Sequence, residues 1–242
     1  MLVAAGLRAG RSHRDRDLPC QDAFAVEEAT AKGRAVAAVG DGLGSRRLSH
    51  EGSRVATRAA VESLLAARRL GPTAMHRAFV AARTAIRRRA KGLGASTDDL
   101  ATTLHVVAVT ADRVHAASVG DGAILSAGTE GPQILLPPPD AEYANEVVPV
   151  TAPSWRDHFR VGIEVAPRNV FLLTDGLTRL LMTRQAGVWK PFGPFFDRFL
   201  PRMAAKPFDP TLVRRFLDSD AVDHAWDDDK CLVVIGVGAD AC

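Results

Sequence analysis

Cysteine and long apolar runs are scarce in this 242-residue chain, and each scarcity narrows what the protein can be. The three cysteines are too few and too scattered for a disulfide framework, and no CxxC pair offers a zinc site. No apolar stretch approaches the roughly 20 residues of a transmembrane helix. The N-terminal stretch carries an early arginine and no signal-like apolar segment. We therefore expect a soluble protein of a reducing compartment, the cytoplasm.

The chain also lacks the motifs of several enzyme classes. It has no G-x-S-x-G nucleophile elbow, no P-loop, no Rossmann glycine motif and no H-E-x-x-H zinc motif. The net charge is only +3, because 31 basic residues are balanced by 28 acidic ones. Such a balance gives no indication of nucleic-acid or membrane binding, and we expect neither partner.

What the chain does have is enough apolar sequence, 47% of its residues, to bury a full core, and we expect one domain over residues 1–242. Strands grouped before and after helices, without βαβ alternation, predict an α+β fold of layered antiparallel sheets with helices outside. Ser49 and Thr73 are the expected N-caps of the first two helices, and Gly71-Pro72 the expected stop of the first. The predicted strands are 2–7, 22–26, 34–39, 101–110, 113–119, 123–127, 159–164, 170–174 and 231–236, and the predicted helices are 49–70, 73–92, 177–183, 191–203 and 210–217.

Two features of the middle of the chain carry further expectations. The three strand-like runs from 101 to 127 read as an antiparallel meander. The proline-punctuated segment 137–153 reads as a surface loop, and it has the length of a lid.

Three of the predicted strands end in an aspartate followed by glycine, namely Asp41, Asp121 and Asp175, and a fourth acidic group at 227–229 precedes the last apolar run. One such Asp-Gly pair is most often an ordinary turn. Its recurrence behind apolar runs instead favours acids that converge on one site. Hard cations such as Mg²⁺ and Mn²⁺ prefer carboxylate, carbonyl and water oxygens, so the expected ligand is such a cation.

A ligand set follows from these positions: Asp41, the Gly42 carbonyl, Asp175 and Asp228, with Asp22 as a candidate for holding a metal-bound water. Two cations a few ångströms apart lower the pKa of a bridging water and clamp a phosphoryl group for in-line attack. Asp41, Asp175 and Asp228 are therefore the candidate catalytic residues. No side-chain nucleophile is then needed, which agrees with the missing motifs.

Arg14 and Arg16 lie shortly before Asp22 and allow two interpretations. They hold a substrate phosphate, since a guanidinium offers a planar pair of donors, or they only solvate a loop. The histidines have no partners at metal-ligand spacing. Cys20 and Cys231 are expected to pack as small hydrophobes.

In their order along the chain, these motifs resemble those of the metal-dependent protein serine/threonine phosphatases of the PP2C type, and especially their divergent bacterial branch. The resemblance covers nearly the whole chain. The matching segments are Pro19-Cys20-Gln21-Asp22-Ala23, Val39-Gly40-Asp41-Gly42-Leu43-Gly44, Ala101-Thr102-Thr103-Leu104, Val119-Gly120-Asp121-Gly122, Leu173-Thr174-Asp175-Gly176-Leu177 and Asp228-Asp229-Lys230-Cys231-Leu232-Val233-Val234.

The resemblance implies a four-layer αββα sandwich with a two-metal site between the sheets. It also implies hydrolysis of phosphoserine and phosphothreonine in proteins that serine/threonine kinases modify, with Mn²⁺ or Mg²⁺ as cofactor. By the resemblance, Asp41 would bridge the two metals, Gly42 would ligate through its carbonyl, and Asp175 and Asp228 would ligate the second metal. Asp22 would act through water, and Asp121 would help to form a third, weaker metal site.

Some positions depart from the family pattern. Gln21 stands where many members have an acid, Asp229 where they have asparagine, and Leu43 where eukaryotic members have a histidine. The usual arginine would fall at Asp17, so phosphate binding would shift to Arg16 or Arg14.

The departures at Gln21 and Asp17 motivate an alternative, a pseudophosphatase that binds phosphopeptides or regulates without turnover. A third interpretation is a structural domain whose acids only cap turns.

Overall fold

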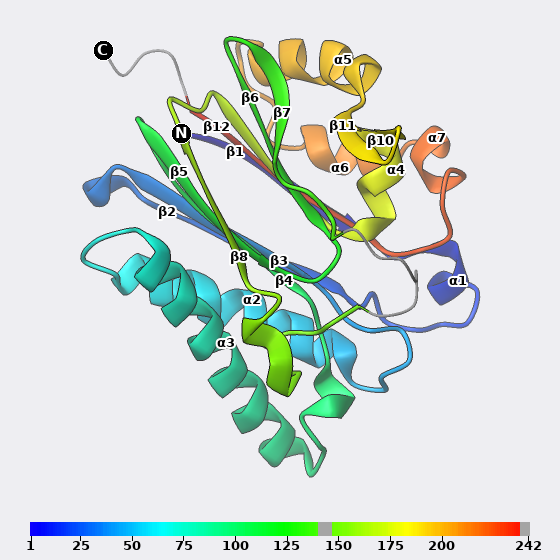
Figure 1. Cartoon of the computed structure of the whole chain (residues 1–242). Helices are drawn as coiled ribbons and strands as arrows, with labels where there is room; N and C mark the ends of the chain where they lie inside the picture. The colour runs from blue at the N-terminus through cyan, green and yellow to red at the C-terminus, as the bar shows by residue number, and fades with distance from the viewer. Residues whose placement is uncertain (140–146, 238–242) are drawn as a thin grey trace.

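The computed structural model describes residues 1–139 and 147–237 and consists of two five-stranded antiparallel sheets with helices on their outer sides (Figure 1). The first sheet has the strand order β1-β12-β9-β6-β7, and the second β2-β3-β4-β5-β8. The strands are β1 (Leu2–Arg8), β2 (Asp22–Ala29), β3 (Arg34–Asp41), β4 (Leu104–Thr110), β5 (Arg113–Val119), β6 (Ala123–Gly128), β7 (Gly131–Leu136), β8 (Arg160–Val165), β9 (Asn169–Leu173) and β12 (Lys230–Gly236).

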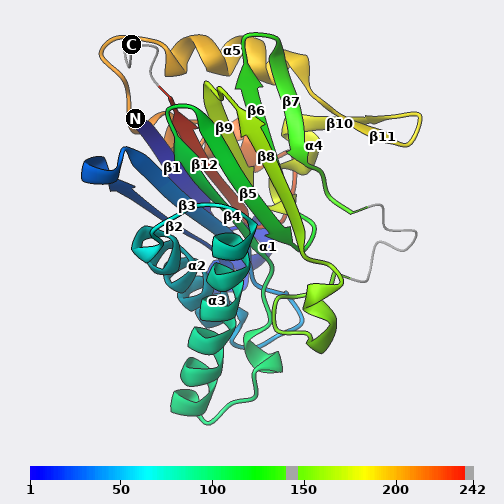
Figure 2. The ribbon, with the colours of Figure 1, turned by 60° about the vertical axis from the view of Figure 1, so that its left-hand side comes forward.

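Helices complete the layers on both sides. Two long helices, α2 (Ser49–Ala66) and α3 (Pro72–Leu93), lie on the outer face of the second sheet, and α4 (Thr178–Leu181), α5 (Gly193–Met203) and α6 (Leu212–Leu217) cover the first (Figures 1 and 2). This arrangement confirms the expected α+β sandwich. None of the described helices is both long and apolar enough to cross a bilayer. The remaining elements are α1 (Arg11–Arg14), α7 (Asp220–Asp223) and a hairpin of β10 (Met182–Gln185) and β11 (Val188–Pro191).

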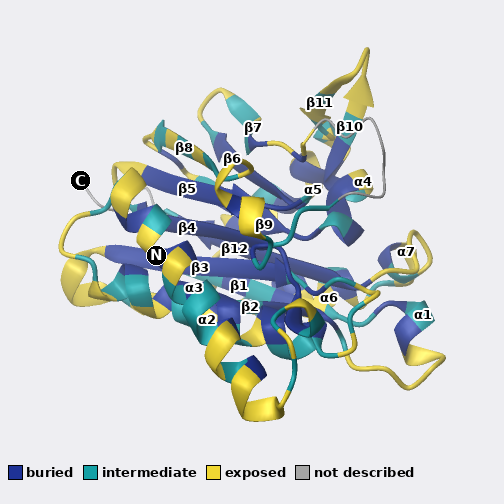
Figure 3. Cartoon of the chain, turned by 60° about the horizontal axis from the view of Figure 1, so that its bottom comes forward, coloured by how far each residue is buried: buried dark blue, intermediate teal, exposed yellow. Residues whose placement is uncertain are grey.

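The central strands are buried on both faces, which explains why their sequences are continuously apolar (Figure 3). In β3, Val36 and Ala38 pack in the cluster beneath α2 and α3. The alternate residues Ala35, Ala37 and Val39 pack in the cluster between the two sheets. Successive side chains of a strand point to opposite faces, so one strand contributes to two cores. A third apolar cluster lies between the first sheet and its helices.

The helix termini differ from the sequence-based prediction. Ser49 lies inside α2, whose N-cap is Leu48, and α2 ends at Ala66 rather than at residue 70. The cap of α3 is Gly71 rather than Thr73, with Pro72 as the first helical residue. Proline favours that position because its missing N–H has no helical partner there and its φ already suits a helix.

The strand predictions need two corrections. The run from 101 to 127 is not one meander, because β6 leaves the second sheet and pairs with β9 and β7 of the first. Strand β7 and the β10–β11 hairpin were not predicted. Strand β7 precedes the expected loop, and β10 takes the last two residues of the helix expected at 177–183. Of the predicted loop 137–153, residues 140–146 lie outside the described residues.

Candidate active site

Five aspartates lie at one end of the two sheets. Asp22 begins β2 and Asp41 ends β3, and the antiparallel register places them opposite each other. Asp121 follows β5, Asp175 follows β9, and Asp228 precedes β12. In the second sheet β3 and β5 flank the antiparallel strand β4, so both run in the same direction and end at the same end of the sheet. In the first sheet β12 is antiparallel to β9, so the start of β12 lies beside the end of β9.

The tip of β3 is fixed by two threonines that precede β4. The Thr103 hydroxyl accepts a hydrogen bond from the Asp41 amide at 2.9 Å, and the Thr102 hydroxyl donates to the Asp41 carbonyl oxygen at 2.9 Å. The Gly42 amide donates to the Gln21 carbonyl oxygen at 3.1 Å. The Thr-Thr motif therefore holds the backbone at Asp41 and Gly42, which leaves the Asp41 carboxyl group free of these contacts.

A direct contact joins the acidic ends of the two sheets. Thr174 follows β9 in the first sheet, and its hydroxyl donates a 2.7 Å hydrogen bond to the carboxyl group of Asp22 in the second sheet. The same hydroxyl accepts from the Cys231 amide at 3.0 Å. The other carboxyl oxygen of Asp22 is buried without a hydrogen-bond partner in the described structure. Asp22 thus lies at the junction of the sheets with one oxygen unused.

The carboxyl groups perturb one another. Burial raises the pKa of Asp22 and of Asp41 well above the ordinary value, and the nearby charges of Asp175 and Asp228 raise both further. Burial, followed by the charges of Asp121 and Asp228, raises the pKa of Asp175 to about 7. Carboxylates that raise each other's pKa in this way are close neighbours in a poorly solvated place. Asp22, Asp41, Asp121, Asp175 and Asp228 thus influence one another electrostatically at this end of the sheets.

Asp121 has one cationic neighbour that the sequence did not reveal. Arg160 donates to the Gly120 carbonyl oxygen at 3.1 Å and to the Ser118 hydroxyl at 3.0 Å. Burial raises the pKa of Asp121, and the Arg160 charge opposes that rise. Behind them Ser118 bonds the His105 ring at 2.8 Å, and burial lowers the His105 pKa to about 3, so this imidazole is neutral at pH 7. Arg160 begins an edge strand and belongs to no motif, so no sequence signal marks it.

Asp229, at the position where the family has asparagine, has a structural role that the sequence did not reveal. Its buried carboxylate accepts hydrogen bonds from the Gly10 amide at 2.7 Å and the Gln21 amide at 2.5 Å. It also contacts the His13 Nδ1 atom at 2.9 Å. The partner of His13 therefore lies 216 residues away, which no local spacing could indicate. Asp229 fastens the N-terminal segment next to Asp228.

The predicted phosphate ligands have other partners in this structure. Arg14 donates to both carboxyl oxygens of Asp223 at 2.9 Å, and Arg16 donates to the Ser12 carbonyl oxygen at 2.7 Å. A pocket of about 300 Å³ reaches the acidic end beside Asp228, and it is also lined by Ser12, Trp226 and Asp227.

The donor chemistry fits a hard cation. Asp22 Oδ1 and Asp121 Oδ1 are buried oxygens without hydrogen-bond partners, and such atoms ordinarily have a water or ion beside them. Among residues 1–139 and 147–237, however, no three His, Cys, Asp or Glu side chains are spaced so that they hold a metal ion as they stand. The role of the acids as metal ligands thus stays a prediction.

Comparisons with known proteins agree with this fold. The profile of the family described as protein phosphatase 2C matches residues 9–217. Serine/threonine-protein phosphatase 3 of Escherichia coli (strain K12) is 28% identical over 239 residues, which cover 93% of this chain and 94% of that protein.

Solved structures share the fold at low identity. A bacterial serine phosphatase superposes with a TM-score of 0.71 at 13% identity over 100% of both chains. The serine/threonine phosphatase Stp1 from Staphylococcus aureus gives 0.66 at 14% identity, over 99% of this chain and 96% of that one. With more than half of its length matched by the family profile, the chain belongs to the protein phosphatase 2C family.

Proposed function

We propose that this protein is a metal-dependent protein serine/threonine phosphatase. The observation that carries the proposal is the group of carboxyl groups from both sheets whose pKa values are raised by burial and by each other. Such a group is costly for a fold to keep unless positive charge enters it. Serine/threonine phosphatase activity in the Escherichia coli relative, as its name states, supports the same assignment.

In this proposal Mn²⁺ or Mg²⁺ ions bind among Asp41, the Gly42 carbonyl, Asp175 and Asp228, with Asp22 acting through water and Asp121 at a third, weaker site. Bound divalent cations supply Lewis-acid chemistry and activate water for phosphoryl transfer. The protein's own contribution is positional. The Thr102 and Thr103 hydrogen bonds hold the backbone that carries Asp41 and Gly42.

The substrate in this proposal is a phosphoserine or phosphothreonine side chain of a protein, added by a serine/threonine kinase in the cytoplasm. The open pocket beside Asp228 supports access for such a side chain from solvent. Arg14 and Arg16 remain the proposed phosphate ligands. Arg14 would have to exchange its bonds to Asp223 for bonds to the phosphate, whereas the exposed Arg16 would give up one backbone contact.

The test is phosphate release from p-nitrophenyl phosphate and from a phosphothreonine peptide, with Mn²⁺ and with EDTA. We expect turnover only with the metal, and a fall of about a hundredfold or more in Asp41→Asn. The matched control is Asp197→Asn, an exposed aspartate on α5, which should keep wild-type activity. Activity that persists in EDTA and in Asp41→Asn would refute the proposal.

A second candidate, a pseudophosphatase that only binds phosphopeptides or regulates, is favoured by one observation: the side chain of Arg14 is engaged by Asp223 and the Ala9 carbonyl oxygen. Calorimetry separates the two candidates. Peptide and metal binding without any phosphate release would support the binding module, and turnover would exclude it.

A further inference from the structure

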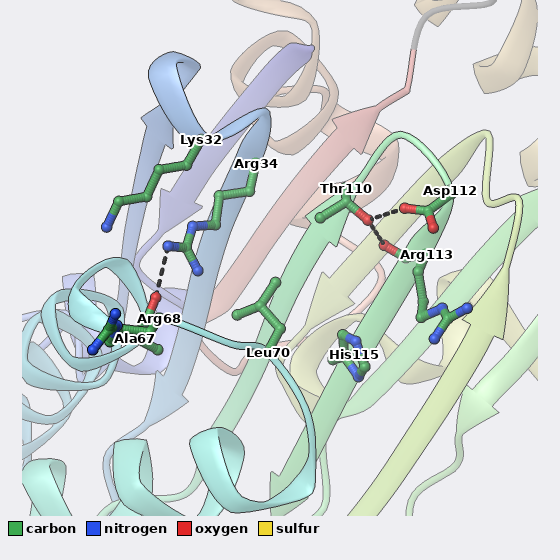
Figure 4. Close-up of a pocket in the computed structure, with 9 residues that line it drawn as sticks. All are labelled: Lys32, Arg34, Ala67, Arg68, Leu70, Thr110, Asp112, Arg113 and His115. Carbon is green, nitrogen blue, oxygen red and sulfur yellow. Dashed lines mark hydrogen bonds between the residues drawn. The ribbon is translucent and has the colours of Figure 1, made fainter.

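A basic pocket lies at the opposite end of the second sheet from the acidic residues. It has a volume of about 610 Å³ and is formed by the β2–β3 turn, the loop after α2 and the β4–β5 turn (Figure 4). Arg34 begins β3 and Asp41 ends it, so at about 3.3 Å per residue the two ends are roughly 23 Å apart. The pocket is thus separate from the proposed active site.

The pocket is strongly cationic in a chain that is nearly balanced overall. Lys32, Arg34, Arg68 and Arg113 line it together with one carboxylate, Asp112. That carboxylate accepts a 2.7 Å hydrogen bond from the Thr110 hydroxyl, which lowers the Asp112 pKa and keeps the group ionised. Burial and the Arg113 charge lower the pKa of His115, so its ring is neutral at pH 7. The lining therefore carries a net charge of about +3.

Two of the cations are already held in place. Lys32 donates to the Leu65 carbonyl oxygen at 2.7 Å, and Arg34 donates to the Ala67 carbonyl oxygen at 2.8 Å, both at the C-terminal end of α2. An ammonium has three donors and a guanidinium five, so each keeps N–H groups for another acceptor. Fixed donors lose little side-chain entropy when a ligand arrives, which favours binding.

Polar atoms in the lining also lack partners. Arg34 is only 7% exposed and His115 only 9%, yet Arg34 Nε and His115 Nδ1 are buried with no hydrogen-bond partner in the described structure. Arg68 and Arg113 are exposed and form no ion pair with any residue of 1–139 or 147–237. Figure 4 shows Lys32, Arg34 and Arg68 on one side of the pocket and Arg113 and His115 on the other.

We propose that this basic pocket binds a small polyanion that carries two or three phosphate groups. Paired guanidinium donors suit phosphate oxygens, and the two sides of the pocket bring arginines to a ligand from opposite directions. The volume lies in the range of small-molecule sites, about 300–1,000 Å³. Apart from His115 the lining holds no aromatic ring on which a nucleobase could stack, so the phosphates themselves would be recognised.

The test is calorimetric titration of inorganic tripolyphosphate into the wild-type protein in EDTA, which keeps metal-mediated binding out of the measurement. We expect one-site binding that weakens about tenfold in Arg68→Glu and in Arg113→Glu, because each change removes charge-assisted hydrogen bonds at an exposed position. Affinity should also fall as salt rises. Melting curves check that both variants fold.

The matched control is Arg202→Glu, an exposed arginine on α5, which packs on the first sheet rather than the second and contributes no residue to the pocket; this variant should bind like the wild type. No binding by the wild type, equal binding by Arg113→Glu and wild type, or an equal loss in Arg202→Glu would overturn the proposal. Tighter binding of a doubly phosphorylated peptide than of tripolyphosphate would overturn the small-molecule assignment. The experiment needs no metal and no turnover, so its outcome is independent of the proposed phosphatase activity.

Discussion

Replacing Asp175 by asparagine should make the metal-free protein more stable while removing its response to Mn²⁺. The pKa of Asp175 is raised from 3.8 to about 7, first by burial and then by the charges of Asp121 and Asp228. At pH 7 a rise of this size lowers the free energy of unfolding by roughly 4 kcal/mol, because the native state disfavours the ionised carboxylate. Asparagine has no charge to bury or to repel its neighbours.

We expect Asp175→Asn to gain less stability than this full amount. Asp175 is partly exposed, so solvent screening reduces the repulsion, and asparagine loses part of the hydrogen bonding to Asp41 and the Gly176 amide. We expect the free energy of unfolding in EDTA to rise by about 1–2 kcal/mol. The substitution also removes the repulsion of the Asp41 and Asp22 carboxylates by Asp175, whose charge raises the pKa of both groups.

The assay is urea unfolding at pH 7, in EDTA and in excess Mn²⁺. The wild type should gain stability with Mn²⁺ by ligand linkage, whereas Asp175→Asn should start higher in EDTA and gain little. Asp197→Asn is the control and should follow the wild type in both conditions. An Asp175→Asn protein that is less stable than the wild type in EDTA, or that keeps the full Mn²⁺ response, would refute the reasoning.

Other predictions follow from the same structure. The metal-free wild type should lose stability as pH rises from about 5 to about 8, because carboxyl groups with raised pKa values bind more protons in the native than in the unfolded state, and Mn²⁺ should flatten this dependence in melting curves. Asp229→Ala should cost roughly 3 kcal/mol in urea unfolding, since three buried partners lose their acceptor, whereas Asp227→Ala should cost under about 1 kcal/mol; equal losses would contradict this. Gly52→Ala should destabilise by about 2 kcal/mol or more, because the new Cβ would lie 2.0 Å from the Leu100 carbonyl oxygen. A Cβ added at Gly92 would have no atom within 4 Å, so Gly92→Ala should stabilise α3 by about 0.5–1 kcal/mol. Similar melting temperatures for Gly52→Ala and Gly92→Ala would contradict this pair of predictions.

The acidic end of the fold was accessible from sequence because its signals are local. An apolar run that ends in Asp-Gly indicates a strand that presents a carboxylate, and this holds at Asp41 and Asp175. The layer order also follows from the grouping of strands and helices. These inferences need only a few consecutive residues, which is the range over which hydrophobic periodicity and turn preferences act.

The contacts that fix the site were not accessible, because they join distant parts of the chain. Asp229 bonds Gly10, His13 and Gln21 across more than 200 residues, and nothing next to it in sequence indicates a buried role. Arg160 stands at the start of an edge strand in no recognisable motif, and only the folded structure brings it to the Gly120 carbonyl oxygen.

The crossing of β6 to the first sheet was missed for a related reason. Its apolar sequence suits either sheet, and only pairing with β9 and β7 decides which one.

The most direct test of the account is a crystal grown with Mn²⁺ and measured at a wavelength where manganese scatters anomalously. The account predicts manganese peaks at the end of the sheets where β3, β9 and β12 meet, bonded to carboxyl oxygens of Asp41, Asp175 and Asp228. Peaks only at unrelated surfaces, or these three side chains on separate faces with no ion between them, would contradict it.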